Sequence, residues 1–402
     1  MVVNSLYLNQ TVVTSFANHG PSATNTNTTT TTTTTTTDSN DGVYVLHIEA
    51  CPSSSFISCA LSDHSIHLYD RQTLQNIQKL PNAHKEIITD LSFVSKDSSP
   101  FILASSSQDG YVHIYDLRQP ITTTTTSTYP CIKCQTPNHE KPMTFSLGYG
   151  GTLLAMGTDQ ANIHFMDARR TPSTLLGSYV DAHTDEVTSL TFSSSTSTHL
   201  CSSSEDALLC VFDTSQPSEE SALQSVMNVN NTPIRTAGFF GTQQQGLYCL
   251  TGSETLSVYH WESAQPIHHF GGLQLRNDLT QFNVISSPIQ YMIGCHWNES
   301  ANALYLLAGS YDGNTAVFQV NADSIEPLYA LHSQNNSGHQ TCIRAFDWYQ
   351  PSISSSPILI TGGEDSKLCQ WLTTPKHVND KHSKGIRTTV AKKTSSHKHK
   401  LK

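Results

Sequence analysis

Histidine, aspartate and cysteine are the residue types in this 402-residue chain whose spacing suggests chemistry. Several of the 20 histidines are followed, roughly 25 residues later, by an aspartate at a turn. Converging His and Asp side chains are typical of acid–base catalysis or of a metal site. Here one pair recurs in each of several sequence repeats, which favours a structural role in a repeated turn. The pairs are His84 with Asp109, His183 with Asp206, and His339 with Asp365.

The pair Cys131 and Cys134 forms the chain's CxxC motif, and His139 lies nearby. A structural zinc site needs four ligands, and the sequence has neither a second CxxC nor an HxxxH to supply the rest. We therefore expect no metal at this place. The alternative is a strand of the third repeat that carries two free thiols.

Motifs of nucleotide binding and hydrolysis do not occur in the sequence. It contains no GxGxxG or GxxxxGK[ST] phosphate loop, no GxSxG nucleophile elbow and no HExxH zinc helix. The sequence therefore predicts a protein that is not an enzyme, with no catalytic residues and no cofactor.

A repeated hairpin organises the chain and positions these residues. In Leu103–Arg118, two apolar runs flank the turn Asp109-Gly110, and the second run ends at Tyr115-Asp116. Asp-Gly between alternating apolar runs is a strong hairpin signal. A short apolar strand precedes each copy and a loosely patterned strand follows it, which gives the four strands of a propeller blade. Related hairpins span residues 56–70, 152–167, 200–213, 248–262, 305–319 and 359–371.

The repeats predict an all-β, seven-bladed β-propeller, and none of the segments shows convincing helical periodicity. The last repeat ends soon after Trp371 and lacks an outer strand, whereas an N-terminal β-rich run, residues 8–16, precedes the first repeat. Because an open edge exposes unpaired backbone groups, we expect this N-terminal strand to close the ring. The predicted repeats span residues 43–80, 83–128, 129–180, 183–224, 225–268, 269–331 and 338–374.

Composition divides the chain into a propeller at residues 1–375 and a basic tail at 376–402. The tail carries a net charge of +8 and the remainder −18. The tail and the Thr-rich loop at residues 21–40 lack apolar periodicity and are expected to be disordered. The insertions 121–129 and 271–290 are expected to be surface loops.

The last repeat resembles those of the WD-repeat β-propeller family. It has Gly338-His339 before its first strand, Thr361 in the second, Asp365 at the turn and Trp371 in the third. The resemblance implies a buried hydrogen-bond relay from His through the hydroxyl to Trp, with Asp fixing the turn. Two other repeats match in part, one through His84, Asp109 and Tyr115, and the other through His183, Ser204, Asp206 and Phe212.

Two Asp-x-Arg sequences stand just past the third strands of consecutive repeats. They are Asp116 with Arg118 and Asp167 with Arg169. In the WD-repeat family this pattern resembles the box by which substrate receptors dock on the adaptor of cullin-4 ubiquitin ligases. Arginine suits such docking because its planar fork makes paired hydrogen bonds. The alternative is a pair of ordinary surface arginines.

These features predict a non-catalytic scaffold or adaptor of the WD-repeat type that binds other proteins. One alternative is a cullin-4 substrate receptor, and another is a nuclear or nucleolar assembly factor whose tail contacts RNA. The tail matches a nuclear import signal, a weak, salt-dependent nucleic-acid arm or a solubilising segment. With no signal peptide and no membrane-length apolar run, we expect the protein inside the cell, in the nucleus or cytoplasm, without membrane contact.

Overall fold

A computed structural model of the chain describes most of the predicted propeller. The Thr-rich segments at 21–40 and 121–129 and the basic tail at 376–402 lie outside the described residues, so the expectations for them stay predictions. The described residues are 3–13, 42–51, 55–94, 101–118, 131–170, 173–332, 338–350 and 355–373.

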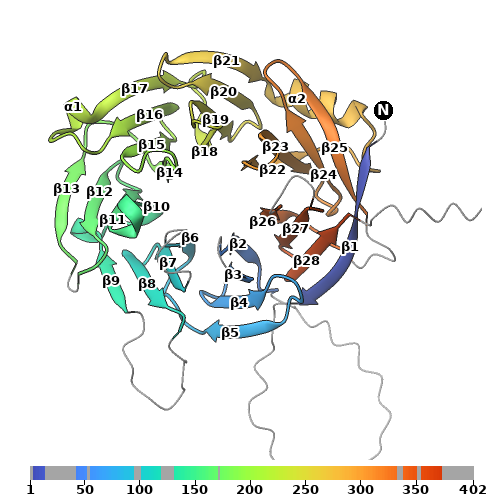
Figure 1. The fold of residues 1–402 in the computed structure, drawn as a ribbon, viewed down its shortest axis with the longest axis horizontal. Coiled ribbons are helices and arrows are strands. Elements are labelled where there is room, and N and C mark those ends of the chain that lie inside the picture. Colours follow the sequence, from blue (N-terminus) through green and yellow to red (C-terminus); the bar gives the residue numbers. More distant parts are fainter. Residues whose placement is uncertain are drawn as a thin grey trace, which may run out of the picture.

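Seven blades surround a central channel, and each blade is built on antiparallel strands (Figure 1). The first holds β2 (Val45–Ala50), β3 (Phe56–Leu61), β4 (Ile66–Asp70) and β5 (Asn76–Leu80). The second holds β6 (Ile88–Phe93), β7 (Ile102–Ser107), β8 (Tyr111–Asp116) and β9 (Ile132–Gln135). The third holds β10 (Pro142–Gly148), β11 (Leu153–Thr158), β12 (Ile163–Asp167) and β13 (Leu175–Tyr179), with short 3-10 turns at Pro137–His139 and Tyr149–Gly151.

The fourth to seventh blades repeat this order. The fourth holds β14 (Val187–Phe192), β15 (His199–Ser204), β16 (Leu208–Asp213) and β17 (Leu223–Asn228), with α1 (Glu219–Ala222) before β17. The fifth holds β18 (Ile234–Phe240), β19 (Gly246–Thr251), β20 (Leu256–His260) and β21 (Gln265–Phe270). The sixth holds β22 (Tyr291–Asn298), β23 (Ala303–Gly309), β24 (Thr315–Val320) and β25 (Ile325–His332), and the seventh holds β26 (Ile343–Tyr349), β27 (Ile358–Gly363) and β28 (Lys367–Leu372).

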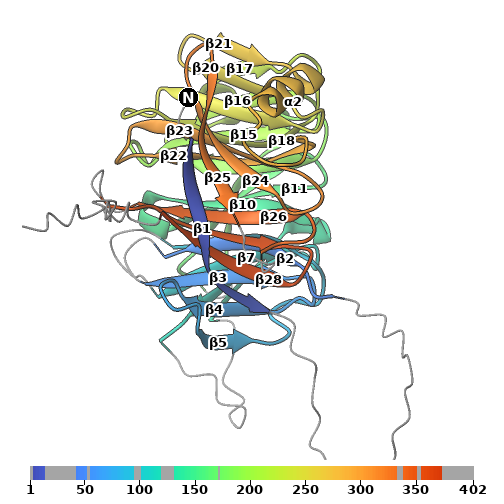
Figure 2. The same cartoon turned by 90° about the vertical axis from the view of Figure 1, so that its right-hand side faces the viewer.

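The N-terminal strand β1 (Asn4–Val13) closes the ring, as the sequence predicted, although it begins and ends earlier than the expected 8–16. Its second half pairs antiparallel with β28, from Tyr7 opposite Leu372 onward. Its first half pairs in parallel with β25, beginning with Asn4 opposite Tyr329. The strand therefore joins the last two blades into one continuous sheet (Figure 2).

Apolar layers between neighbouring blades form the core. Between the first two blades, Ile66 and Leu68 pack with Leu103 and Tyr115, and all four side chains are almost fully buried. Leu6 of β1 belongs to the layer between the sixth and seventh blades. A four-stranded sheet has two faces to bury and cannot do so alone, so the ring is the unit of stability.

Three details of the predicted organisation were wrong. β9 belongs to the second blade, so the CxxC segment is not a strand of the third repeat, and β17 belongs wholly to the fourth blade. The link at 271–290 is not simply a loop, because it contains the helix α2 (Gly272–Gln281). Leu275 and Leu279, four positions apart, are buried against the layer between the fifth and sixth blades. Two apolar positions are too short a pattern to distinguish a helix from a loop in sequence.

The described residues include no helix that is long and apolar enough to cross a membrane.

Candidate partner-binding surfaces

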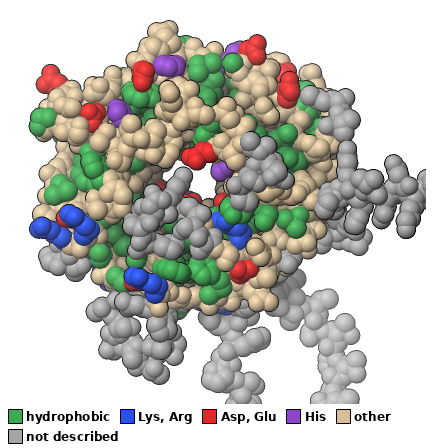
Figure 3. Space-filling model, in the orientation of Figure 1, with side chains coloured by type: hydrophobic (Ala, Val, Ile, Leu, Met, Phe, Trp, Pro, Cys, Tyr) green, Lys and Arg blue, Asp and Glu red, His purple; other side chains and the backbone are tan. Residues whose placement is uncertain are grey.

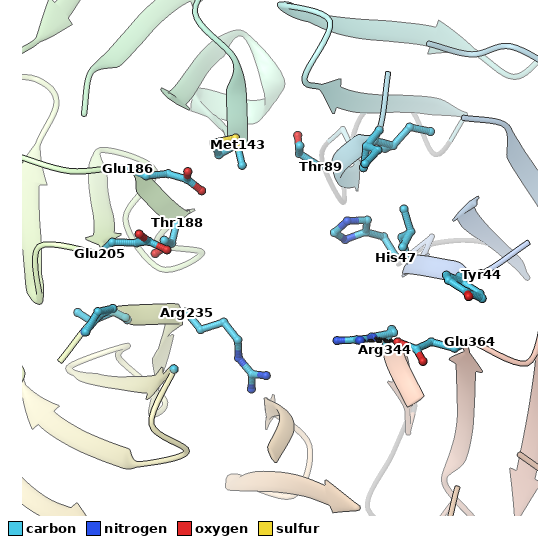
Figure 4. Close-up of a pocket in the computed structure, with 16 residues that line it drawn as sticks. Tyr44, His47, Thr89, Met143, Glu186, Thr188, Glu205, Arg235, Arg344 and Glu364 are labelled. Atoms are coloured by element: carbon cyan, nitrogen blue, oxygen red, sulfur yellow. Dashed lines mark hydrogen bonds and ion pairs between the residues drawn. The ribbon is translucent and has the colours of Figure 1, made fainter. Parts of the chain in front are cut away.

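The loops of the ring lie on two faces. We define the upper face by the loops that lead into each first strand and by the turns between second and third strands. The lower face carries the turns between first and second strands and those that follow each third strand. Figures 1 and 3 look onto the lower face, and Figure 4 shows the upper mouth of the channel.

The seventh blade contains a complete relay on its upper side. The ring of His339 is held at both nitrogens, with Nδ1 2.9 Å from Asp365 Oδ1 and Nε2 2.9 Å from Thr361 Oγ1. The indole N–H of Trp371 donates to the same hydroxyl at 2.8 Å. Asp365 also accepts a hydrogen bond from the backbone N–H of Gln340, and it thereby ties the loop to the turn.

The second blade repeats this arrangement without the tryptophan. His84 Nδ1 lies 3.1 Å from Asp109 Oδ2, and its Nε2 lies 2.8 Å from Ser105 Oγ. The hydroxyl of Tyr115 donates instead to the backbone carbonyl of Ala83. Each of these buried polar groups has a partner, as buried groups require.

The fourth blade corrects one predicted residue. His183 contacts Asp206 at 3.1 Å, but its second partner is Ser202 Oγ at 2.7 Å and not the predicted Ser204. Ser204 donates to the backbone carbonyl of Asp185. Ser202 precedes Asp206 by four residues, as Ser105 precedes Asp109, so the spacing held a signal that the residue-type match overlooked.

The third blade has an inverted relay that the sequence analysis missed. Glu140 stands in the loop before β10, and its Oε2 lies 2.9 Å from His164 Nε2 and accepts from Thr158 at 2.8 Å. Asn162 donates to the other carboxylate oxygen at 3.1 Å. The histidine therefore comes from the third strand and the carboxylate from the loop, which no search for a His-first pattern would find.

The relays change the ionisation of their members. Burial opposes ionisation of Asp109, Asp206 and Asp365, but the hydrogen bonds from histidine and the backbone outweigh it and lower all three pKa values. Burial likewise disfavours protonated His339, yet the contacts to Asp365 and Cys369 prevail and raise its pKa to about 9. These groups are enclosed in blade turns, and this supports a structural role.

The part of the chain that the structure describes has no group of three or more metal-ligating side chains, at the cysteine pair or elsewhere. Cys131 is exposed and Cys134 is buried in β9. Burial raises the pKa of the Cys134 thiol to about 11, so it is not a thiolate at neutral pH. His139 contacts the amide of Gln135 at 3.0 Å.

The two Asp-x-Arg sequences share one geometry on the lower face. Arg118 donates through Nε and Nη2 to the two oxygens of Asp116, at 2.8 and 2.6 Å. Arg169 does the same with Asp167, at 2.9 Å for both contacts. The hydrogen bonds from Arg169 lower the pKa of Asp167 to about 2.

Both arginines remain open to solvent, with 58% of the Arg118 side chain and 66% of the Arg169 side chain exposed. A hydrogen bond from Ser173 to the backbone carbonyl of Lys133 links the segment after β12 to β9 of the neighbouring blade. Figure 3 shows Lys and Arg side chains in neighbouring places at the lower left of the rim, where the second and third blades lie. We call Arg118 and Arg169, with their aspartates, the arginine pair.

The upper mouth of the channel is a second surface, which the sequence analysis did not identify. It encloses about 680 Å³. Figure 4 shows Glu186 and Glu205 near one another on one side, Arg235 extending toward the middle, and Arg344 beside Glu364 on the other. Its lining comes from residues as far apart in sequence as 44 and 364, so only closure of the ring assembles it.

Carboxylates also lie deeper in the channel. Burial, with the nearby charges of Asp347 and Asp90, raises the pKa of Glu49 to about 8. Burial raises the pKa of Asp347 to about 6, although Arg71 Nε lies 3.9 Å from its Oδ2. These groups come from the innermost strands and carry protons at a pH where exposed carboxylates do not.

Sequence comparison places the chain among repeat proteins. The family model described as "WD domain, G-beta repeat" matches residues 74–116 and 173–213. The WD repeat-containing protein 89 homolog of Dictyostelium discoideum is 29% identical over 85% of this chain and 86% of its own length. WD repeat-containing protein GTS1 of Arabidopsis thaliana is 27% identical over 82% of this chain and 81% of its own length.

A solved structure has the same fold. A chain from the structure titled "Crystal Structure of Mitotic Checkpoint Complex" matches with a TM-score of 0.60. The match covers 89% of this chain and 100% of that one, at 14% sequence identity. At this identity the likeness concerns the fold alone.

Proposed function

We propose that the chain binds another protein through the arginine pair of its lower face. Its fold and its repeats resemble those of WD-repeat β-propellers. WD-repeat proteins are generally interaction scaffolds. The role is non-catalytic. The His and Asp residues that could have served catalysis are enclosed in blade turns. The arginine pair is exposed and repeated on consecutive blades.

The observation that carries the proposal is that each guanidinium is fixed yet only partly used. Arginine has five N–H donors, and the contacts to the neighbouring aspartate use two of them. The remaining donors of Arg118 and Arg169 can reach carboxylate or carbonyl oxygens of a partner. Because the aspartates already hold the side chains, docking costs less rotamer entropy than it would with free arginines.

The partner we propose is the adaptor of cullin-4 ubiquitin ligases, which makes this chain a substrate receptor. Support comes from the position of both Asp-x-Arg sequences, which begin at the last residue of the third strand on adjacent blades. The residues before them are Tyr115 and Met166, where the family's box has Trp. Both side chains are buried between blades, so this difference changes the packing beneath the aspartates and leaves the exposed arginines in place.

Affinity purification with mass spectrometry tests this proposal. We would compare the wild type with the double variant Arg118→Glu/Arg169→Glu. The variant Lys85→Glu/Lys141→Glu is a matched control, because it reverses two exposed charges on the upper face. We expect the adaptor with the wild type and the control but not with the double variant. Identical partner sets from all three proteins would contradict the proposal.

The alternative of an RNA-contacting assembly factor depends on the charge of the tail, which lies outside the described residues. Its support remains the net charge of +8 in residues 376–402.

A further inference from the structure

Carboxylates on the third and fourth blades form an acidic sector at the upper mouth, which we define as Asp159, Asp185, Glu186 and Glu205. Within the described residues, none of Asp185, Glu186 and Glu205 is in an ion pair. Burial raises the pKa of Glu186, and the charges of Glu205, Asp159 and Asp185 raise it further, whereas Lys141 lowers it. The sector therefore has an excess of negative charge that a cation would relieve.

The cationic side chains at the mouth have other partners. Arg344 is paired with Glu364, and Arg235 donates to the backbone carbonyl of Met292 at 2.6 Å. Apolar side chains complete the rim, and Tyr44 and Ile87 are 43% and 46% exposed. A mouth with carboxylates on one side and apolar groups on the other fits lysine, whose long stem packs on apolar surface while its ammonium seeks a negative charge.

We propose that the chain's own C-terminal tail, residues 376–402, docks across the acidic sector and places a lysine in the mouth. The tail has nine Lys and Arg and one acidic residue, and the rest of the chain has a net charge of −18. The structure thus supplies the acidic surface, and the sequence supplies a basic segment tethered to it.

The tether is long enough. The described chain ends at Thr373, just after β28, on the lower side of the seventh blade. The residues that follow span on the order of 95 Å when extended. A six-residue strand, which sets the thickness of the ring, spans roughly 20 Å. The tail therefore reaches the upper mouth around the rim or through the channel with length to spare.

Tethering makes weak contacts sufficient. An exposed ion pair contributes roughly 0.2–1 kcal/mol, so a few of them give only a weak complex between separate molecules. A disordered tether, as the sequence predicts here, provides an effective concentration on the order of millimolar. In the docked state the acidic sector is occupied by the tail, so a basic segment of a partner must compete with the tail for it. The tail lysines are occupied as well, so a polyanion must compete with the acidic sector for them.

Carboxyl–amine cross-linking of the full-length protein tests the docking, with mass spectrometry to locate the links. An equal mixture of unlabelled and isotope-labelled protein distinguishes links within one molecule from links between two. We expect tail lysines to link to Asp185, Glu186 or Glu205 of the same molecule. Raising the salt to about 0.5 M should remove most of these links, because screening weakens exposed pairs.

Two triple variants make the test specific. In Asp185→Asn/Glu186→Gln/Glu205→Gln, total cross-linking of the tail lysines should fall by about five-fold. The matched control Glu262→Gln/Asp323→Asn/Glu326→Gln removes three exposed carboxylates of the lower rim and should leave it unchanged. Equal cross-linking in both variants, or links mainly between two molecules, would overturn the proposal.

A binding measurement gives an independent readout. A single-stranded oligouridine should bind the upper-face triple variant several-fold more tightly than the wild type, because the released tail is free for phosphates. The lower-rim control should bind it as the wild type does. Equal affinity of the wild type and the upper-face variant would show that the tail is not held by the acidic sector.

Discussion

The relays of the upper turns and the arginine pair of the lower rim use the same contact, a basic side chain held by aspartate, in opposite surroundings. The side chain of His84 is fully buried beside Asp109, whereas that of Arg118 is 58% exposed beside Asp116. Removing one partner of a buried pair leaves the other polar group with neither a hydrogen-bond partner nor water. Removing one partner of an exposed pair only returns the other to water. The comparison teaches that the buried pair contributes to the stability of the fold, whereas the exposed pair contributes little to it and stays accessible to a partner.

The largest expected effect concerns β1, the strand that runs between the two faces. Deleting residues 1–13 should lower the free energy of unfolding by several kcal/mol, on the order of 5, because it exposes β25 and β28 as edges and uncovers the layer around Leu6. Thermal and urea unfolding measure the change. Unchanged stability would show that ring closure does not depend on this strand.

Next in size is the contrast between one buried and one exposed pair. His339→Ala should cost about 2–4 kcal/mol, because Asp365 and Thr361 lose a buried partner. Arg169→Ala should leave the urea midpoint close to that of the wild type, since its pair is exposed. Urea unfolding of both variants and the wild type checks this. Equal losses would remove the distinction between the faces.

A pH series sharpens the same contrast at the relay. The pKa of His339 is about 9 in the folded protein, above the roughly 6.5 of an unfolded histidine. Its contribution is therefore complete below pH 6.5 and is lost as the pH rises through about 9. The stability difference between the wild type and His339→Gln should shrink over this range. A difference that stays constant from pH 6 to pH 10 would contradict the assignment.

The channel carboxylates should also make the folded protein less stable as the pH rises, but here the substitution should stabilise it. Because the pKa of Glu49 is raised to about 8, the folded protein holds a proton that the unfolded chain releases near pH 4.3. Glu49 therefore costs stability increasingly as the pH rises from about 4.3 toward 8. Glu49→Gln should be nearly neutral at pH 4 and stabilising at pH 8, with the gain growing across this range. No pH dependence of this difference would argue that Glu49 is not desolvated.

The sequence was sufficient for the repeated features of the fold. The hairpins, the ring and its closing strand follow from local patterns that recur, such as the run before Trp371 and the spare N-terminal strand. Blade boundaries were harder, because outer strands such as β9 and β17 are short or follow long links and have weak apolar patterns. Recurrence made the fold predictable where single strands were ambiguous.

Site details depended on three-dimensional pairing. Ser202 and Ser204 point to the same side of β15, so strand alternation does not show which of them contacts His183. The contact is made by Ser202, which precedes Asp206 by four residues. Glu140 was missed because it exchanges roles with His164. The upper mouth collects side chains from several blades and has no local signature in the sequence.

The most direct test of the central claim is the affinity of the purified protein for the purified cullin-4 adaptor. We predict that Arg118→Glu/Arg169→Glu weakens this binding by at least about 30-fold, roughly 2 kcal/mol, with unchanged urea stability. The upper-face variant Asp185→Asn/Glu186→Gln/Glu205→Gln should bind within about three-fold of the wild type. Wild-type affinity in the arginine double variant, or no binding by the wild type, would contradict docking through the arginine pair.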